Sequence, residues 1–316
     1  MTPRRRPPTV VKLGGELLEE TARRRRLAGA LADVAEREPL VVVHGGGREV
    51  DAEMARLGIP KRAVDGLRIT DGPTLDVVAG VLAGRVNTRL VAALGVAGAS
   101  AVGLTGADGG LARVRRERRY RAADGAQVDL GFVGKPVGSE PPALLLDLLG
   151  AGHVPVVASL GSGPGGQIFN INADTLAGFL AARLGARRLI IAGGTAGVLD
   201  ADGRTIPAVD DRAIDALIGG GQASAGMVAK LLACRAALKG GAGAVAIVDG
   251  RQARRGMFDN AAGLPFAPGR ASAAGRPFAT GRASAAGLPF AAGTTVIAGT
   301  RRRPQASRTA ARGEGR

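Results

Sequence analysis

Short apolar segments that lack an alternating polar pattern, each followed by a helical pattern, constrain the fold of this 316-residue chain more than any other feature. A strand that is apolar at every position is buried on both faces, as in a parallel sheet covered by crossover helices. The sequence therefore predicts an α/β fold, a three-layer αβα sandwich with a mostly parallel, open central sheet. The expected strands are residues 9–13, 39–43, 99–104, 153–158, 188–192, 244–248 and 294–298.

Helical patterns fill the gaps between these strands. They cover residues 17–38, 48–57, 74–94, 143–150, 175–184, 212–217 and 227–239. Residues 113–131 are charged and contain turn signals, so we expect a protruding hairpin there. Residues 261–292 hold a twelve-residue repeat with one Phe in each copy, which favours an inserted flexible loop over a small solenoid. After this insert, we expect strand 294–298 to pair with strand 244–248.

The net charge of +16 is concentrated toward the ends of the chain. Residues 1–8 carry +3, residues 251–300 carry +5 and residues 301–316 carry +5, which leaves +3 for residues 9–250. The chain has no Trp and one Tyr, so a stacking platform for single-stranded nucleic acid is not expected. A mildly basic body suits anionic small molecules. The arginine-rich ends leave a nucleic-acid-associated protein as an alternative.

The single cysteine, Cys234, cannot build a disulfide framework or a zinc site, and we expect no protein-bound metal. No long apolar stretch follows the N-terminal arginines, so a secretory signal is not predicted. No run approaches the roughly 20 apolar residues of a membrane span. We therefore expect a cytoplasmic protein with no membrane partner.

Glycines directly follow two of the expected strands, at the carboxyl ends where parallel sheets bind their ligands. Glycine lets the backbone approach a phosphate closely, and backbone N–H groups donate to anionic oxygens. Taken alone, each cluster could be a plain strand-to-helix turn. His44, just before the second cluster, is expected to be a satisfied buried histidine without a catalytic role. The glycines are Gly14 and Gly15 after the first strand, and Gly45, Gly46 and Gly47 after the second.

Two lysines stand out among the five in the chain. Lys12 lies inside an otherwise apolar strand, and a buried ammonium group is costly unless an anion pairs with it. A phosphate ligand would supply that anion, although a lysine that snorkels at the sheet rim is the alternative. Lys230 lies on an expected helix and could equally be a solvated lysine.

Polar residues near the middle of the chain complete the candidate site. Asp174 lies near the start of an expected helix, shortly after Asn170, and the alternative interpretation of this run is a helix N-cap. Arg68 could hold a carboxylate through two N–H donors. By itself, Arg68 could as easily pair with Asp65 or Asp71.

In this order, the lysines, glycine clusters and Asn-Ile-Asn-Ala-Asp run resemble the amino acid kinase family, and within it the acetylglutamate kinases. The resemblance runs from about residue 9 to residue 250 and resumes near residue 294. It implies a single domain over residues 9–300. The lobe of residues 9–174 would hold the acyl substrate, and the lobe of residues 175–300, with the insert at 261–292, would hold ATP. Disordered basic ends are expected at residues 1–8 and 301–316.

The resemblance implies ATP-dependent phosphorylation of the γ-carboxylate of N-acetyl-L-glutamate, a step of arginine biosynthesis, with Mg²⁺ carried on the nucleotide phosphates. Lys12 and Lys230 would neutralise the migrating phosphoryl group, and Asp174 would orient both lysines. The attacking carboxylate is already ionised at neutral pH, so no general base is needed. The remaining implied roles are substrate binding by Gly46, Gly47, Arg68 and Asn170, phosphate binding by Gly14, Gly15 and Gly45, and nucleotide binding by Gly194, Thr195, Gly197, Leu199 and Ser224.

The chain departs from the family pattern on the nucleotide side. The family commonly has an aspartate in the turn where this chain reads Gly193-Gly194-Thr195. Residues 1–8, with their prolines, do not suit the extra N-terminal helix of arginine-regulated hexamers, so we expect a homodimer without that feedback. Besides the nucleic-acid-associated protein, two alternatives remain. One is a kinase of a related acyl-amino acid such as carrier-bound aminoadipate; the other is a non-catalytic relative with a binding or regulatory role.

Overall fold

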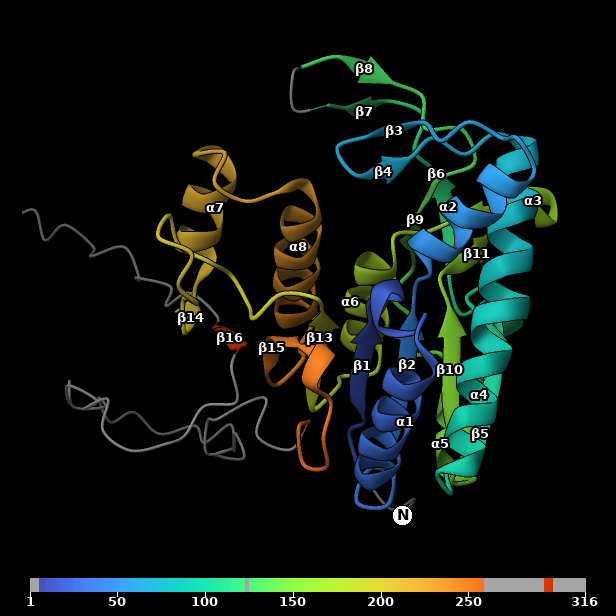
Figure 1. The fold of residues 1–316 in the computed structure, drawn as a ribbon, viewed down its shortest axis with the longest axis vertical. Helices are drawn as coiled ribbons and strands as arrows, with labels where there is room; N and C mark the ends of the chain where they lie inside the picture. The colour runs from blue at the N-terminus through green and yellow to red at the C-terminus, as the bar shows by residue number, and fades with distance from the viewer. Residues whose placement is uncertain (1–5, 123–124, 259–292, 298–316) are drawn as a thin grey trace, which may run out of the picture.

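An eight-stranded sheet forms the centre of the part of the protein that the computed structural model describes, which is residues 6–122, 125–258 and 293–297 (Figure 1). Neighbouring strands are parallel, except for the antiparallel pair β15–β16. This arrangement confirms the predicted mostly parallel sheet. Across the sheet the order is β14 (Ala208–Val209), β16 (Gly293–Val296), β15 (Val245–Asp249), β13 (Arg188–Gly193), β1 (Thr9–Leu13), β2 (Leu40–His44), β10 (Val154–Ala158) and β5 (Ala101–Thr105).

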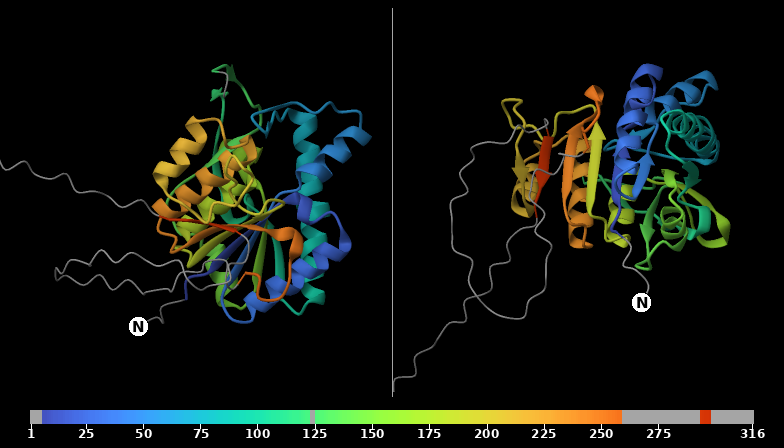
Figure 2. Two further views of the ribbon diagram at one scale, coloured as in Figure 1. Left: turned by 60° about the vertical axis from the view of Figure 1, so that its left-hand side comes forward. Right: turned by 90° about the horizontal axis from the view of Figure 1, so that it is seen from below.

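Helices cover both faces of the sheet, as the two views in Figure 2 show. Alternate strand residues point into two separate apolar cores, because successive side chains of a strand point to opposite faces. Val11 and Val42 belong to one core, whereas Val10 and Val41 belong to the other. The first core packs against α1 (Thr21–Ala35), α2 (Gly47–Arg56), α3 (Gly72–Ala79) and α4 (Asn87–Val96); the second packs against α5 (Ala143–Gly150), α6 (Ala173–Arg183), α7 (Asp211–Gly219) and α8 (Ala225–Lys239).

Short strands form three smaller sheets beside the main sheet. The protruding hairpin expected at residues 113–131 is confirmed, and Tyr120 Oη donates to Asp65 Oδ2 at 2.9 Å, which joins it to the β3–β4 hairpin. The strands around residues 160–170 were not predicted, because three-residue strands have too few positions to show a pattern. These short elements are β3 (Ala63–Val64), β4 (Leu67–Arg68), β6 (Arg113–Arg116), β7 (Tyr120–Arg121), β8 (Gln127–Val128), β9 (Gly134–Val137), β11 (Leu160–Ser162) and β12 (Ile168–Asn170).

The helix expected at residues 17–38 was wrong at its start. A short 3₁₀ turn, η1 (Gly15–Leu17), follows β1, and α1 begins only at Thr21. Leu17 ends this turn, Leu18 directly follows it, and both side chains are buried. The turn therefore brings both leucines into the core before the helix begins.

The long helix expected at residues 74–94 contains a π-helical segment, η2 (Gly80–Val86), between α3 and α4. By length and composition alone the continuous helix Gly72–Val96 could cross a membrane, contrary to the expectation that no segment could. Val78, Leu82 and Leu90 pack into the first core, so we assign the helix to the protein interior. The expectations for the repeat at 261–292 and the tail at 301–316 lie outside the described residues.

Candidate active site

The carboxyl ends of β1, β2 and β10 meet at one cavity, as expected for the strands of a parallel sheet. Nine of the predicted site residues line it together. The cavity also contains residues that the sequence did not single out, among them Glu16 and Ser159. The nine predicted residues are Lys12, Gly14, Gly15, Gly45, Gly46, Gly47, Arg68, Asn170 and Asp174.

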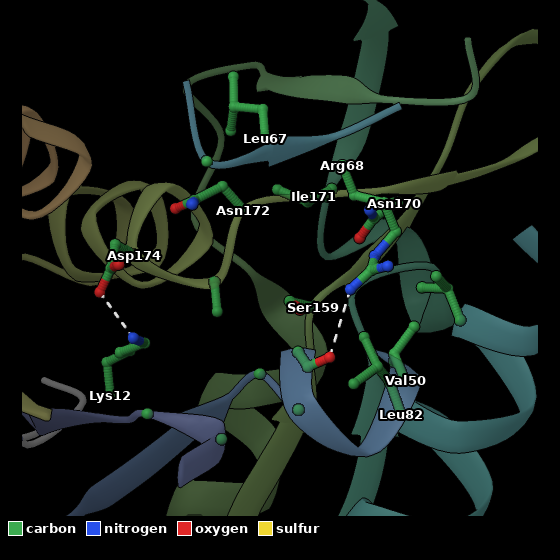
Figure 3. A pocket seen from close by; sticks show the side chains of 18 of the residues that line it. Lys12, Val50, Leu67, Arg68, Leu82, Ser159, Asn170, Ile171, Asn172 and Asp174 are labelled. Atoms are coloured by element: carbon green, nitrogen blue, oxygen red, sulfur yellow. Dashed lines mark hydrogen bonds and ion pairs between the residues drawn. The ribbon is translucent and has the colours of Figure 1, made fainter. Parts of the chain in front are cut away.

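One carboxylate joins the two predicted lysines. Lys12 Nζ lies 2.9 Å from Asp174 Oδ1, and Lys230 Nζ lies 3.5 Å from Asp174 Oδ2. Lys12 reaches Oδ1 at ion-pair distance without the alignment of a hydrogen bond, whereas Lys230 donates a long hydrogen bond to Oδ2. Figure 3 shows Lys12 and Asp174 facing each other across one end of the cavity. Folding therefore brings β1, α6 and α8 together around a single negative charge.

Asp174 is ionised although it is only 5% exposed. Burial alone would raise the pKa of its carboxyl group, but the charges of Lys12 and Lys230 outweigh that effect and lower it. The N-cap of α6 is Asn172, whose side chain accepts from Thr175 N at 3.0 Å. The N-cap interpretation thus applies to Asn172, and Asp174 in the first turn is free to hold the lysines. Lys12 is buried and paired, so it does not snorkel.

The two glycine clusters press against each other. A Cβ built on Gly15 would lie 2.6 Å from Gly46 Cα, 2.9 Å from Gly46 N and 3.0 Å from Gly47 N. Only a residue without a side chain allows this approach. Gly46 and Gly47 also begin α2, where the first N–H groups have no intrahelical acceptor. This part of the site is therefore suited to anionic oxygens.

Arg68 and Asn170 lie together at the other end of the cavity (Figure 3). The alternative in which Arg68 pairs with Asp65 or Asp71 was wrong: its guanidinium group pairs with Asp51 on α2 and donates to Gly47 O at 3.2 Å. Asp71 instead caps α3 by accepting from Thr74 N. Contact with α2 holds the guanidinium group beside the Gly45–Gly47 loop.

The predicted nucleotide-side residues lie apart from this cavity. Thr195, Gly197, Leu199 and Ser224 do not line it, and Ser224 is the N-cap of α8. Gly194 is connected to it, because its N–H donates to Glu16 Oε1 at 2.9 Å. Within the described ranges, no group of three or more His, Cys, Asp or Glu side chains is placed to hold a metal ion.

Sequence reasoning missed Glu16, Ser159 and Asp51. The first two directly follow predicted strands or their glycine turns, so the carboxyl-end rule applied to every strand would have found them. Asp51 had no such signal, since its contact with Arg68 depends on how α2 packs against β4.

The chain is similar in sequence to proteins of one known family. A sequence model described as the amino acid kinase family matches residues 7–249. The chain is 45% identical to an acetylglutamate kinase from Gluconacetobacter diazotrophicus over 214 residues, 67% of this chain and 68% of the relative. It is 44% identical to an acetylglutamate kinase from Methanopyrus kandleri over 237 residues, 73% of this chain and 91% of the relative.

Solved structures share the fold. An N-acetylglutamate synthase from Neisseria gonorrhoeae, complexed with coenzyme A and N-acetyl-glutamate, superposes with a TM-score of 0.66 at 26% identity, over 79% of this chain. The matched region spans 55% of that synthase chain. A carbamate kinase from Giardia gives a TM-score of 0.56 at 16% identity over 78% of this chain and 94% of its own, a likeness of fold alone. Together with the match over residues 7–249, these relationships show that the chain belongs to the amino acid kinase family.

Proposed function

We propose that this protein transfers the γ-phosphoryl group of ATP to the γ-carboxylate of N-acetyl-L-glutamate. The observation that carries the proposal is the lysine–carboxylate–lysine cluster beside two glycine loops. The acetylglutamate kinases that match the chain at 44–45% identity support the choice of substrate. The carboxylate oxygen would form a bond to the γ-phosphorus while the bond to the bridging oxygen of ADP breaks.

Charge is the main obstacle to this reaction, because an anionic carboxylate must approach an anionic phosphate. Preorganised cations and N–H dipoles lower such a barrier without reorganising during the reaction. In this proposal Lys12 and Lys230 hold opposite sides of the phosphoryl group. Asp174 keeps both ammonium groups in place while no substrate is bound. No proton has to move, since the attacking carboxylate is ionised at neutral pH.

The glycine loops would hold the reacting oxygens. The N–H groups of Gly15, Gly46 and Gly47 would donate to the phosphoryl group and the γ-carboxylate. Arg68 and Asn170, at the far end of the cavity, would hold the α-carboxylate of the substrate. The approach of Gly15 to Gly46 supports this role, because it leaves no side chain between the two loops.

The nucleotide would enter from the β13 side, where Gly194 is tied to Glu16. Lysines and backbone N–H groups form a donor set that fits phosphate oxygens. Mg²⁺ carried on the nucleotide phosphates would reduce their negative charge. The lobe division of the domain, with residues 9–174 for the acyl substrate and residues 175–300 for ATP, is part of this proposal.

A side-by-side assay tests the proposal. Purified protein with MgATP is offered N-acetylglutamate, glutamate, aspartate or carbamate; ADP release is recorded, and the acyl phosphate is trapped with hydroxylamine. We expect turnover with N-acetylglutamate and a kcat/KM at least about 100-fold lower with glutamate, because the free α-ammonium group of glutamate would place a positive charge beside Arg68. Binding of N-acetylglutamate without ADP release would favour the non-catalytic relative and contradict the proposal.

A further inference from the structure

His44, the last residue of β2, is fully buried and both of its ring nitrogens have partners. Nδ1 lies 3.0 Å from Gly45 O, and Nε2 lies 3.0 Å from Asn87 Nδ2. A carbonyl oxygen can only accept, so Nδ1 carries the proton and donates it to Gly45 O. Nε2 then accepts from the Asn87 amide. The hydrogen-bond network therefore assigns a single neutral tautomer.

Burial keeps this ring neutral. Desolvation lowers the pKa of His44 from 6.5 to about 4, against a smaller opposing effect of its bond to Gly45. His44 therefore remains uncharged at neutral pH and does not serve as a proton donor or acceptor in the reaction. Its polar groups are occupied in holding the backbone that leads into the second glycine cluster.

Asn87 connects this histidine to the rest of the sheet. Its side-chain amide lies 2.8 Å from Val156 O and 3.3 Å from Leu104 O, in addition to His44 Nε2. It therefore contacts the three neighbouring strands β2, β10 and β5 from the start of α4. A Cβ at Gly103 would lie 2.2 Å from Asn87 Oδ1, so this glycine makes room for the amide.

The π-helical segment η2 immediately precedes Asn87 and touches the same loop. A Cβ built on Gly46 would lie 2.8 Å from Leu82 Cδ2 and 3.1 Å from Val86 Cγ2, both in η2. A π-turn changes the register of the helix that follows it and is often found at functional sites. One helix thus holds the glycine loop from two sides, by packing on Gly46 and by hydrogen bonding through His44 to Gly45.

We propose that Asn87 and His44 are positioning residues that fix the peptide plane between Gly45 and Gly46, so that the Gly46 N–H faces a reacting oxygen of the substrates. The C=O and N–H of one trans peptide point in opposite directions, so a carbonyl held by His44 turns the Gly46 N–H away from the ring. Gly46 N lies beside Gly15, which lines the same cavity, since a Cβ built on Gly15 would be 2.9 Å from that nitrogen. This inference rests on the proposed function for the identity of that oxygen.

Two substitutions at His44 separate its two bonds. In His44→Asn the amide nitrogen can replace Nδ1 and still donate to Gly45 O, whereas in His44→Gln the amide oxygen can replace Nε2 and still accept from Asn87. Removing a donor that orients an oxyanion site lowers kcat, so we expect His44→Gln to lose about tenfold or more and His44→Asn to stay within about threefold of wild type. KM values should change less than kcat in both. Equal activity of the two variants would overturn the proposal.

Two controls keep the result decisive. Leu94→Ala is the first control, because Leu94 lies on α4 with Asn87 but packs in the core. This variant should have a lower melting temperature, while kcat of the folded enzyme is unchanged. A kcat loss that follows the melting temperature in all three variants would show that His44 has a merely structural role.

¹⁵N NMR of wild-type protein is the second control, and it should show a protonated Nδ1 and an unprotonated Nε2 on His44 between about pH 6 and 8. A proton on Nε2 would overturn the proposal even if neither variant folds. If wild type turns over no substrate, the proposed function fails, but the NMR measurement still determines the tautomer of His44.

Discussion

Lys12 Nζ and Asp174 Oδ1 lie 2.9 Å apart, and the other oxygen of the same carboxylate reaches Lys230. One buried anion thus holds two cations that come from opposite ends of the domain sequence. The carboxylate compensates both charges without a ligand, and in the proposed reaction the two ammonium groups would be presented to the phosphoryl group. The pairing accounts for how a lysine can lie inside an apolar strand.

Replacing either lysine should remove stabilisation of the transition state. We expect Lys12→Met and Lys230→Met each to lower kcat by about 100-fold or more, with KM values changed less than kcat. Lys239→Met is the matched control, because Lys239 lies on the same helix as Lys230 but is exposed and pairs with Asp211; its kcat should be unchanged. Steady-state kinetics with MgATP and N-acetylglutamate measure all three. A loss confined to KM would assign the lysines to binding alone.

The salt bridge between Arg68 and Asp51 should set the affinity for the acyl substrate. In Asp51→Asn the guanidinium group loses its charged partner, and its remaining contacts with Gly47 O and Met54 Sδ hold it less firmly. We expect KM for N-acetylglutamate to rise by about tenfold, corresponding to roughly 1.4 kcal/mol, with kcat and KM for ATP nearly unchanged. Asp65→Asn is the control, because Asp65 was an expected partner of Arg68 and instead accepts from Tyr120 on the hairpin. Equal effects of the two substitutions would contradict the assignment.

Much of this site could be predicted from the sequence, because its parts obey local rules. Lys12 was identifiable as a charge in an apolar strand, and the glycine clusters as turns at strand ends. The partner of Arg68 was not predictable, since Asp51 reaches it only through the packing of α2. The bonds of His44 to Gly45 and Asn87 were equally inaccessible. They require β2, β10 and β5 to lie side by side with α4 across their ends, and that order is set by the whole sheet rather than by any segment.

Close contact between the glycine loops predicts that Gly15 tolerates no side chain. In Gly15→Ala the new Cβ would lie 2.6 Å from the backbone of Gly46, so the loops must separate. We expect a loss of about 1–3 kcal/mol in the free energy of unfolding, together with a large loss of activity. Gly29→Ala is the matched control: its Cβ meets nothing within 4 Å inside helix α1, and a gain of up to about 1 kcal/mol is expected. Urea unfolding and kcat measurements on both variants check these expectations. A Gly15→Ala variant that is as stable and as active as wild type would refute the contact between the loops.

The lowered pKa of His44 predicts a pH dependence of stability. Between about pH 6.5 and pH 4 the unfolded chain binds a proton at His44 that the folded protein does not, so the free energy of unfolding falls as the pH drops. At pH 5 the loss relative to neutral pH should be about 2 kcal/mol. Carboxylates with lowered pKa, such as Asp174, lose their contribution only below about pH 4.

Urea unfolding of wild type and His44→Asn at about pH 7.5 and pH 5 isolates this contribution, because every other titrating group is common to both proteins. The variant should lose less stability than wild type on acidification. Parallel losses in the two proteins would show that His44 titrates normally and is not buried as a neutral ring.

The central claim is that two lysines hold one transferred phosphoryl group between them. A crystal structure of the protein with ADP, Mg²⁺, aluminium fluoride and N-acetylglutamate tests it most directly, since the planar fluoride complex mimics the group in transfer. We predict that Lys12 Nζ and Lys230 Nζ each lie within about 3.2 Å of that complex, on opposite sides. A complex bound with either ammonium group out of hydrogen-bonding reach would contradict the account.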